Sequence, residues 1–174
     1  MRKKRLLQLT AALLCAVILS ACGGALADAD YTCTVSISCA TILDNMDQCA
    51  ESKKELVPAD GVILPPTEVA FAEGESAFDV LQRVCRDNGI HLESKFTPVY
   101  NSAYIQGIHN IYEFDVGKLS GWMYAVNDWF PNYGCSLYQV QDGDVIRWVY
   151  TCDLGADVGG GQAAGDGQQE GAST

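Results

Sequence analysis

The stretch GESAFDVLQRVCRDNG, residues 74–89, carries the signals of one amphipathic helix. Ser76 and Asp79 have the spacing of a capping box, in which the serine oxygen accepts an early backbone N–H bond. The dipeptide Asn88-Gly89 supplies a left-handed stop at the other end. Apolar residues recur at helical spacing between these limits, which predicts one buried stripe made of Ala77, Val80, Leu81, Val84 and Cys85.

Strand patterns lie on both sides of this helix. In TCTVSISC, residues 32–39, apolar and polar side chains alternate, so Cys33, Val35, Ile37 and Cys39 share the face of a half-buried strand. GVILPPTEVAF, residues 61–71, predicts a strand that Pro65-Pro66 places at an edge or a bend. Strand patterns also follow the helix, in IHLESKF (90–96), GWMYAV (121–126) and VIRWVYTC (145–152).

Two segments between these strands have weaker patterns. Residues 44–55 are polar, with apolar residues spaced for a short helix or a compact loop. SAYIQGIHNIYEF, residues 102–114, predicts an irregular insertion with a short strand. The order of elements predicts an α+β fold, in its economical form a β-grasp-like mixed sheet wrapped on one main helix, with an irregular insertion.

The N-terminal residues have the layout of an export signal. A positive segment, residues 2–5, precedes the apolar run Leu6–Leu19, which is short for a membrane span. The motif LSAC, residues 19–22, resembles the bacterial lipobox, in which the cysteine becomes the lipidated first residue. We therefore expect lipidation at Cys22 and a location at the cell membrane, lipid-anchored and facing the extracytoplasmic side. An ordinary signal cleaved after Ala27 is the alternative.

The rest of the chain contains one domain of about 125 residues, a size that buries roughly two thirds of the unfolded surface. Its last segment, GADVGGGQAAGDGQQEGAST, has almost no large apolar side chains after Val158 and cannot offset its chain entropy. The predicted segments are a lipoprotein signal peptide (1–21), a tether (22–30), a folded domain (31–155) and a disordered tail (156–174).

The composition is acidic. The formal net charge is −11, and removal of residues 1–21 would leave seven basic and 22 acidic side chains, a charge near −15. Such a surface repels nucleic acid and anionic lipid headgroups, so neither is expected as a partner. Acidity also suits a solvated extracellular surface.

Six cysteines lie beyond Cys15 and Cys22: Cys33, Cys39, Cys49, Cys85, Cys135 and Cys152. An even number outside the cytoplasm predicts up to three disulfides, whose pairing the sequence does not specify. Free buried thiols are the alternative. No pair has the C-x-x-C spacing of zinc or redox sites, and we expect no metal site.

Three motifs together resemble a known family: GESAFDVLQRVC, SGWMYAVNDWFPNYGCS and VQDGDVIRWVYTCDLG. They are similar to the transcobalamin-like C-terminal domain family, a bacterial domain-of-unknown-function group of ligand-binding β-grasp type, over residues 31–155. The resemblance implies binding of a soluble ligand, with cobalamin or a related corrinoid as first candidate. In the cobalamin carriers a large helical barrel clamps the corrin against this domain. This sequence has no such barrel, so a partner protein would supply the other half, or the ligand differs.

The aromatic residues of this region divide into two groups. Trp122 and Trp148 alternate within strands and are expected in the core. NDWFPNYGC, residues 127–135, is rich in turn formers, so its rings form either a folded-back lid or a binding platform. The predicted ligand-binding residues are Trp129, Phe130 and Tyr133, with Asn127 and Asn132 as hydrogen-bonding groups and Tyr138 as a further contact.

Other candidate residues have simpler interpretations. His109 lies in a loop and His91 on a strand face, where solvated imidazoles are common, and Asp142 and Asp144 fit turn chemistry. No motif of the common hydrolase, metalloprotease or nucleotide-binding classes is present, so we expect a protein that is not an enzyme. The leading hypothesis is a cell-surface lipoprotein that binds a soluble ligand and has no cofactor, cobalamin being a bound ligand. The alternative is a non-catalytic adhesion or envelope-assembly module that binds a protein or glycan.

Overall fold

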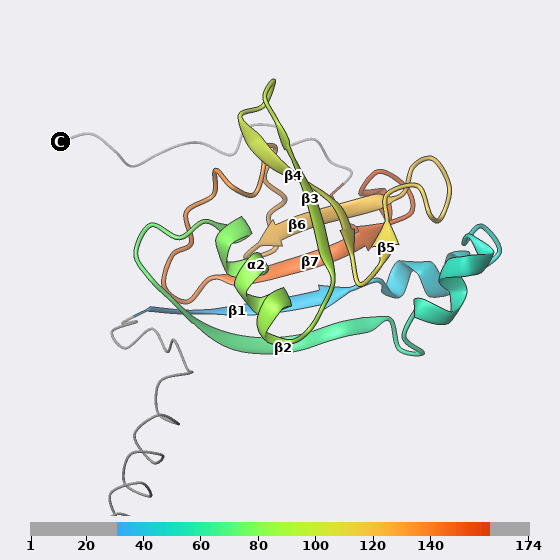
Figure 1. Ribbon diagram of the computed structural model, residues 1–174, viewed down its shortest axis with the longest axis horizontal. Helices are drawn as coiled ribbons and strands as arrows, with labels where there is room; N and C mark the ends of the chain where they lie inside the picture. Colours follow the sequence, from blue (N-terminus) through green and yellow to red (C-terminus); the bar gives the residue numbers. More distant parts are fainter. Residues whose placement is uncertain (1–30, 161–174) are drawn as a thin grey trace, which may run out of the picture.

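Two β-sheets and one α-helix make up residues 31–160, the part of the chain that the computed structural model describes (Figure 1). The α+β class with one main helix is confirmed, but the strands form two sheets where one mixed sheet was predicted. The elements in chain order are β1 (Tyr31–Ser38), η1 (Ala40–Asn45), η2 (Glu51–Leu56), β2 (Val62–Phe71), α2 (Ala77–Asp87), β3 (Leu92–Thr97), β4 (Ser102–Ile108), β5 (Ile111–Tyr112), β6 (Gly121–Val126), β7 (Val145–Thr151) and η3 (Ala156–Val158).

The larger sheet has the strand order β2-β1-β7-β6. Its central pair, β1 and β7, is parallel, with Val35 opposite Ile146 and Ile37 opposite Trp148, while the outer pairs are antiparallel. The first and last strands of the described chain therefore meet in the middle of the sheet. The predicted alternation in β1 is confirmed by the burial of its inward face, which consists of Cys33, Val35, Ile37 and the following Cys39.

β2 lies at one edge of this sheet, as its prolines predict. Ile37 pairs with Leu64 and Val35 with Thr67, so β2 contains one extra residue at Pro65-Pro66. Proline has no backbone N–H, and it is tolerated where one side of the strand has no partner. The prolines therefore hinder pairing of this edge with a further strand.

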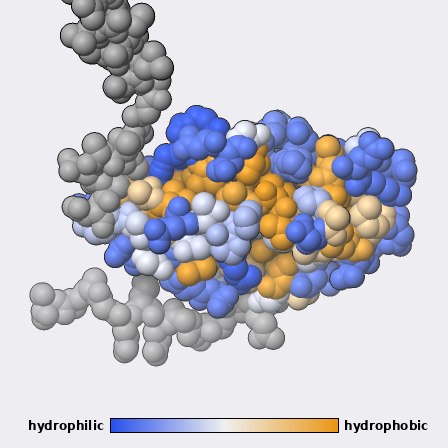
Figure 2. All heavy atoms as spheres, turned by 90° about the horizontal axis from the view of Figure 1, so that it is seen from below, coloured by the Kyte–Doolittle hydropathy of each residue, from blue (hydrophilic) through white to orange (hydrophobic). Residues whose placement is uncertain are grey.

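Figure 2 shows a band of hydrophobic residues on the face seen from below, the side of β2 in Figure 1.

α2 covers one face of the sheet and has the predicted limits (Figure 1). Ser76 accepts a hydrogen bond from the backbone N–H of Asp79, whose carboxylate accepts from the backbone N–H of Ser76. Gly89 has a φ of 65°, the left-handed conformation of a helix stop. The stripe predicted from the sequence is buried in the same core as the inward residues of β1 and β7.

The segment 102–114 differs from the prediction of an irregular insertion. β4 pairs with β3 along its length and with β5 at its end, which gives a three-stranded sheet in the order β3-β4-β5. His109 and Asn110 have φ values of 56° and 59° and form the two-residue turn between β4 and β5. A register shift at Glu93 and Ser94 interrupts the alternation of side chains, and this explains why the sequence pattern is weak.

The six cysteines of residues 31–160 are free thiols, so the expected disulfides do not form in this structure. All but Cys152 are buried, and they face the core from different elements. Burial raises the pKa of Cys33 to about 11 and the pKa of Cys39, Cys85 and Cys135 to about 12.

Several predicted segments lie outside the described residues: the signal peptide, the lipidation site Cys22, the tether and residues 161–174 of the tail. Residues 156–160 continue the ordered chain past the predicted domain end. The carboxylate of Asp157 accepts hydrogen bonds from the hydroxyl of Thr151 and from the backbone N–H of Cys152. No helix of residues 31–160 is long and apolar enough to cross a bilayer.

We predict that iodoacetamide at pH 8 modifies Cys152 of the folded protein well before the other five described cysteines. The reagent attacks the thiolate, and burial both shields the other thiols and keeps them protonated. Mass spectrometry of tryptic peptides measures each site, and unfolding in urea should make all six reactive. Peptides joined by a disulfide in the untreated protein would contradict the free-thiol arrangement.

Candidate functional site

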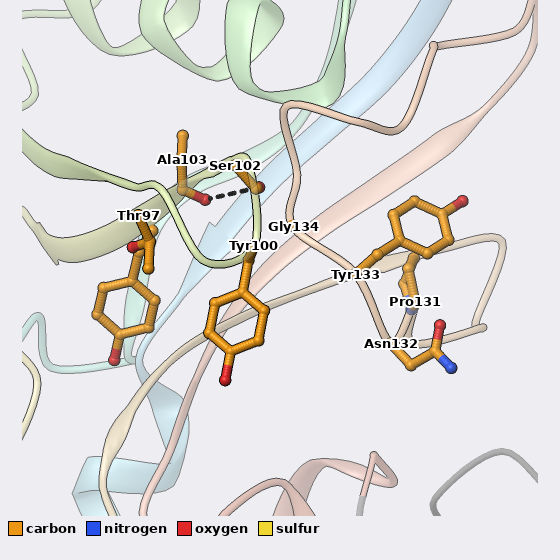
Figure 3. A pocket seen from close by; sticks show the side chains of 9 residues that line it. Thr97, Tyr100, Ser102, Ala103, Pro131, Asn132, Tyr133 and Gly134 are labelled. Atoms are coloured by element: carbon orange, nitrogen blue, oxygen red, sulfur yellow. Dashed lines mark hydrogen bonds between the residues drawn. The ribbon is translucent and has the colours of Figure 1, made fainter.

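A hollow of about 430 Å³ lies between the β3–β4 turn and the β6–β7 loop, and we call it the outer groove. Figure 3 shows Tyr100 and Tyr133 on opposite sides of it, one from each connection. The β3–β4 hairpin extends beyond the larger sheet, so its turn can form a wall (Figure 1). Three of the nine residues that line the groove are tyrosines: Tyr100, Tyr104 and Tyr133. Thr97, Pro131 and Asn132 also contribute side chains to it.

A second hollow of about 190 Å³ adjoins the outer groove, and we call it the inner hollow. The two share Ala103, Tyr104, Pro131 and Gly134. The inner hollow lies between β4 and the inward face of the larger sheet, where Trp122, Tyr124 and Trp148 line it. The two hollows are therefore neighbours, the outer one beside the hairpin turn and the inner one beside the larger sheet.

The two walls of the outer groove touch at Gly134. A Cβ atom at this position would lie 1.5 Å from the Oγ of Ser102, so only glycine allows the approach. The hydroxyl of Ser136 then holds the loop, because it accepts a hydrogen bond of 3.0 Å from the backbone N–H of Ala103. Its Oγ also lies 3.2 Å from that of Ser102. The separation of the walls is therefore set by direct contact.

The base of the β6–β7 loop is held by the carboxylate of Asp144, which is 4% exposed. It accepts hydrogen bonds of 2.8 Å from the side-chain amide of Asn127, the hydroxyl of Tyr138 and the backbone N–H of Gln141. Burial, followed by the bond to Asp144, raises the pKa of Tyr138. The amide oxygen of Asn127 also accepts from the backbone N–H of Val145. Both ends of the loop thus meet at one buried charge.

The structure separates the six residues that the sequence predicts as ligand contacts. Asn132 and Tyr133 line the outer groove. Trp129 is 43% exposed beside it, and its ring meets the ring of Tyr133 edge-on with centroids 6.0 Å apart. Phe130 does not line the outer groove. It is half-buried, and its ring lies close to Gly160. Asn127 and Tyr138 bind Asp144, so they position the loop.

Sequence reasoning missed the wall contributed by the β3–β4 hairpin. Tyr100 is 72% exposed in the turn, and Tyr104 lies in the strand expected to be irregular. Desolvation of the Tyr104 hydroxyl, and then its hydrogen bond to Glu113, raises the pKa of Tyr104 to about 12. The cluster of Phe96, Val99 and Tyr100 around a proline was the available signal, since exposed apolar side chains in a turn are typical of recognition surfaces.

The histidines lie apart from the groove. His109 occupies the β4–β5 turn, and His91 packs against the ring of Tyr112 with centroids 5.9 Å apart. His91 is half-buried, where the sequence suggested an exposed position. Within residues 31–160, no three histidine, cysteine or acidic side chains come together as a metal site.

We predict that Asp144→Asn lowers the free energy of unfolding by about 2 kcal/mol, because hydrogen bonds to a buried charge are strong and the amide cannot replace all three. Urea denaturation measures the loss. The matched control is Asp142→Asn, which removes the same charge at an exposed residue with a single bond to the backbone N–H of Thr32. Equal losses in both variants would show that Asp144 does not anchor the loop.

We predict that Gly134→Ala lowers the free energy of unfolding by about 1–3 kcal/mol, because the new methyl group forces the loop away from Ser102. Gly121→Ala is the control, since a Cβ there would meet its nearest atom at an ordinary 3.8 Å. Urea denaturation compares the two. Unchanged stability of Gly134→Ala would mean that the loop is not held against β4.

Comparison with known proteins finds a family that matches part of the chain. Residues 74–152, from the helix cap through β7, match a family described as Domain of unknown function (DUF4430). No curated protein matches the sequence.

Two solved structures are similar to the chain at low sequence identity. Haptocorrin in complex with Cbi has 13% identity and a TM-score of 0.48; the alignment covers 73% of this chain and 27% of haptocorrin. A proposed metal binding protein from Ruminococcus gnavus has 14% identity and a TM-score of 0.41, with 70% and 97% of the two chains covered. This chain thus spans little more than a quarter of the haptocorrin chain. The match over residues 74–152 agrees with the resemblance to a domain of unknown function that the sequence motifs indicated.

Proposed function

We propose that the protein binds a soluble ligand in the outer groove, through a flat apolar part of that ligand, without transforming it. The observation that supports this most directly is the groove itself, with the rings of Tyr100, Tyr104 and Tyr133 around one hollow. Ligand sites are usually concave and apolar, with a few polar groups that orient the ligand. Asn132 and Thr97 are polar groups of this kind in the wall.

Cobalamin or another corrinoid is the first candidate ligand. The family resemblance of the motifs is the reason for this choice, and haptocorrin is known in complex with Cbi. An open hollow of about 430 Å³ has room for part of such a ligand and leaves the rest exposed. A partner protein that covers the exposed side therefore belongs to the proposal.

We place this activity at the cell surface. Lipidation at Cys22 would anchor the chain, and the described domain begins nine residues later at Tyr31. The acidic composition suits a solvated extracytoplasmic domain. The larger sheet with α2 on one face is the part of the fold that we assign to the β-grasp type.

The alternative function is adhesion or envelope assembly through a protein or glycan. Exposed apolar residues continue outside the groove, which favours this reading: Phe96 and Val99 on the hairpin and Trp129 on the loop. Apolar surface of this kind often marks contacts with macromolecules. Such a partner would use the rims of the groove and leave its floor empty.

We predict that cyanocobalamin binds the full chain and that the double variant Tyr100→Ala, Tyr133→Ala weakens this binding at least tenfold. Each substitution removes apolar contact area with the ligand, which typically contributes about 1–2 kcal/mol of binding free energy per ring. A loss of about 1.4 kcal/mol corresponds to a tenfold weaker affinity. Absorbance titration and calorimetry measure the affinity. Tyr31→Ala is the matched control, because Tyr31 is exposed to the same extent as Tyr133 but packs against Phe71, and neither Tyr31 nor Phe71 lines the groove.

Two results would count against the proposal. Absence of heat and of spectral change at high micromolar cyanocobalamin would exclude this ligand for the chain alone. Binding of an envelope glycan or protein that Trp129→Ala abolishes, and that the groove double variant leaves intact, would favour the alternative.

A further inference from the structure

Two lysines of the described chain have no carboxylate partner. Residues 31–160 contain seven lysines and arginines, and five of them form salt bridges: Lys53, Lys54, Arg83, Arg86 and Arg147. Within these residues, no carboxylate oxygen lies within 4.0 Å of the Nζ of Lys95 or of Lys118. In a chain with a net charge of −11, these two ammonium groups are the ones left to accept an anion from solution.

Lys95 lies on the face of the β3–β4 hairpin that bears the outer groove. Side chains two residues apart on a strand share a face, and so do directly opposite residues of an antiparallel pair. Thr97 is two residues from Lys95 on β3, and Tyr104 is directly opposite Lys95 on β4. Both of these neighbours line the outer groove. Lys95 therefore stands at the rim of the groove.

The side chain of Lys95 is exposed and long enough to meet a ligand beside Tyr104. Opposite residues of an antiparallel pair have Cβ atoms about 5 Å apart, and the ammonium of lysine ends a flexible four-carbon stem. The hydroxyl of Tyr104 donates to the carboxylate of Glu113. That carboxylate forms no salt bridge with Lys95, so the ammonium is available to a ligand.

We propose that Lys95 binds an anionic group, a carboxylate or a phosphate, on the ligand whose flat apolar part lies in the outer groove. This inference rests on the proposed function and extends it to the charge of the ligand. None of the nine residues that line the groove carries a charge. Lys95 thus supplies the positive charge by which the groove distinguishes an anionic ligand from a neutral one of the same shape.

The acidity of the chain as a whole is compatible with this contact. At physiological ionic strength, exposed charges more than about 8 Å apart are largely screened from one another. A single anionic group at the rim therefore interacts mainly with the nearest charges, of which Lys95 is one. A polyanion would meet many acidic side chains at once and be repelled. The proposal concerns a small soluble ligand.

Cinnamate and cinnamamide test this assignment as matched probes, because they share a flat conjugated body and only the first is charged at neutral pH. Titration of the ¹⁵N-labelled full chain measures both affinities, and the amide signals of Thr97 and Tyr104 report on the groove. We expect cinnamate to bind about threefold more tightly, the order of one exposed ion pair. Lys95→Met should remove this preference and leave the affinity for cinnamamide within about twofold.

Lys118→Met is the matched control. It removes the same charge from the other lysine without a carboxylate partner, which lines a separate hollow of about 400 Å³ that shares no residue with the groove. The preference for cinnamate should persist in this variant and narrow at high salt in the unmodified chain. β3 is an edge strand, where lysine hinders pairing with a further strand. If that were the only role of Lys95, Lys95→Met would leave the ratio of the two affinities unchanged.

The outcomes distinguish this inference from the proposed function. Equal affinities for the two probes, with shifts at Thr97 and Tyr104, would refute the role of Lys95 and leave groove binding in place. A preference that survives in Lys95→Met, or that disappears in Lys118→Met, would also overturn the inference. If neither probe shifts the two amide signals, binding of flat apolar groups in the groove and the inference fail together.

Discussion

The buried carboxylate of Asp144 is the interaction on which the candidate site depends. The connection between β6 and β7 contains no regular strand or helix, so it has no ladder of hydrogen bonds to hold it. Three donors from its two ends converge on this one charge instead. Hydrogen bonds to a buried carboxylate are stronger than neutral ones, and they draw together residues at both ends of the connection. The loop that forms one wall of the outer groove is therefore fixed at its base.

The groove itself results from the meeting of two sheets that do not pair. β4 lies beside β6 without a shared ladder, and the β6–β7 loop fills part of the space through the contact of Gly134 with Ser102. Edges that approach without pairing leave a depression between them. Aromatic side chains from both connections line this depression, and the stacked Trp148 lies at its inner end. The same arrangement thus creates the space and lines it with aromatic rings from both sheets.

Local sequence signals predicted the elements whose pattern is complete within a few residues. The capping box and apolar stripe of α2 are of this kind, and so are the alternation of β1 and the edge position of β2. The core position of Trp122 and Trp148 also followed from alternation alone. The pattern failed in β4, because a register shift and a two-residue turn at His109-Asn110 interrupt the alternation within a short segment.

The sequence by itself determined the class of the fold, its helix and the turn-rich aromatic loop, because these depend on spacing along the chain. The tertiary structure alone decided which aromatic rings share a hollow, since Tyr100 and Tyr133 are far apart in sequence and meet only when two connections pack together. It also decided that Asn127 and Tyr138 bind Asp144 and that the described cysteines are free thiols. Each of these is a property of pairs of distant residues, and no local pattern encodes such pairs.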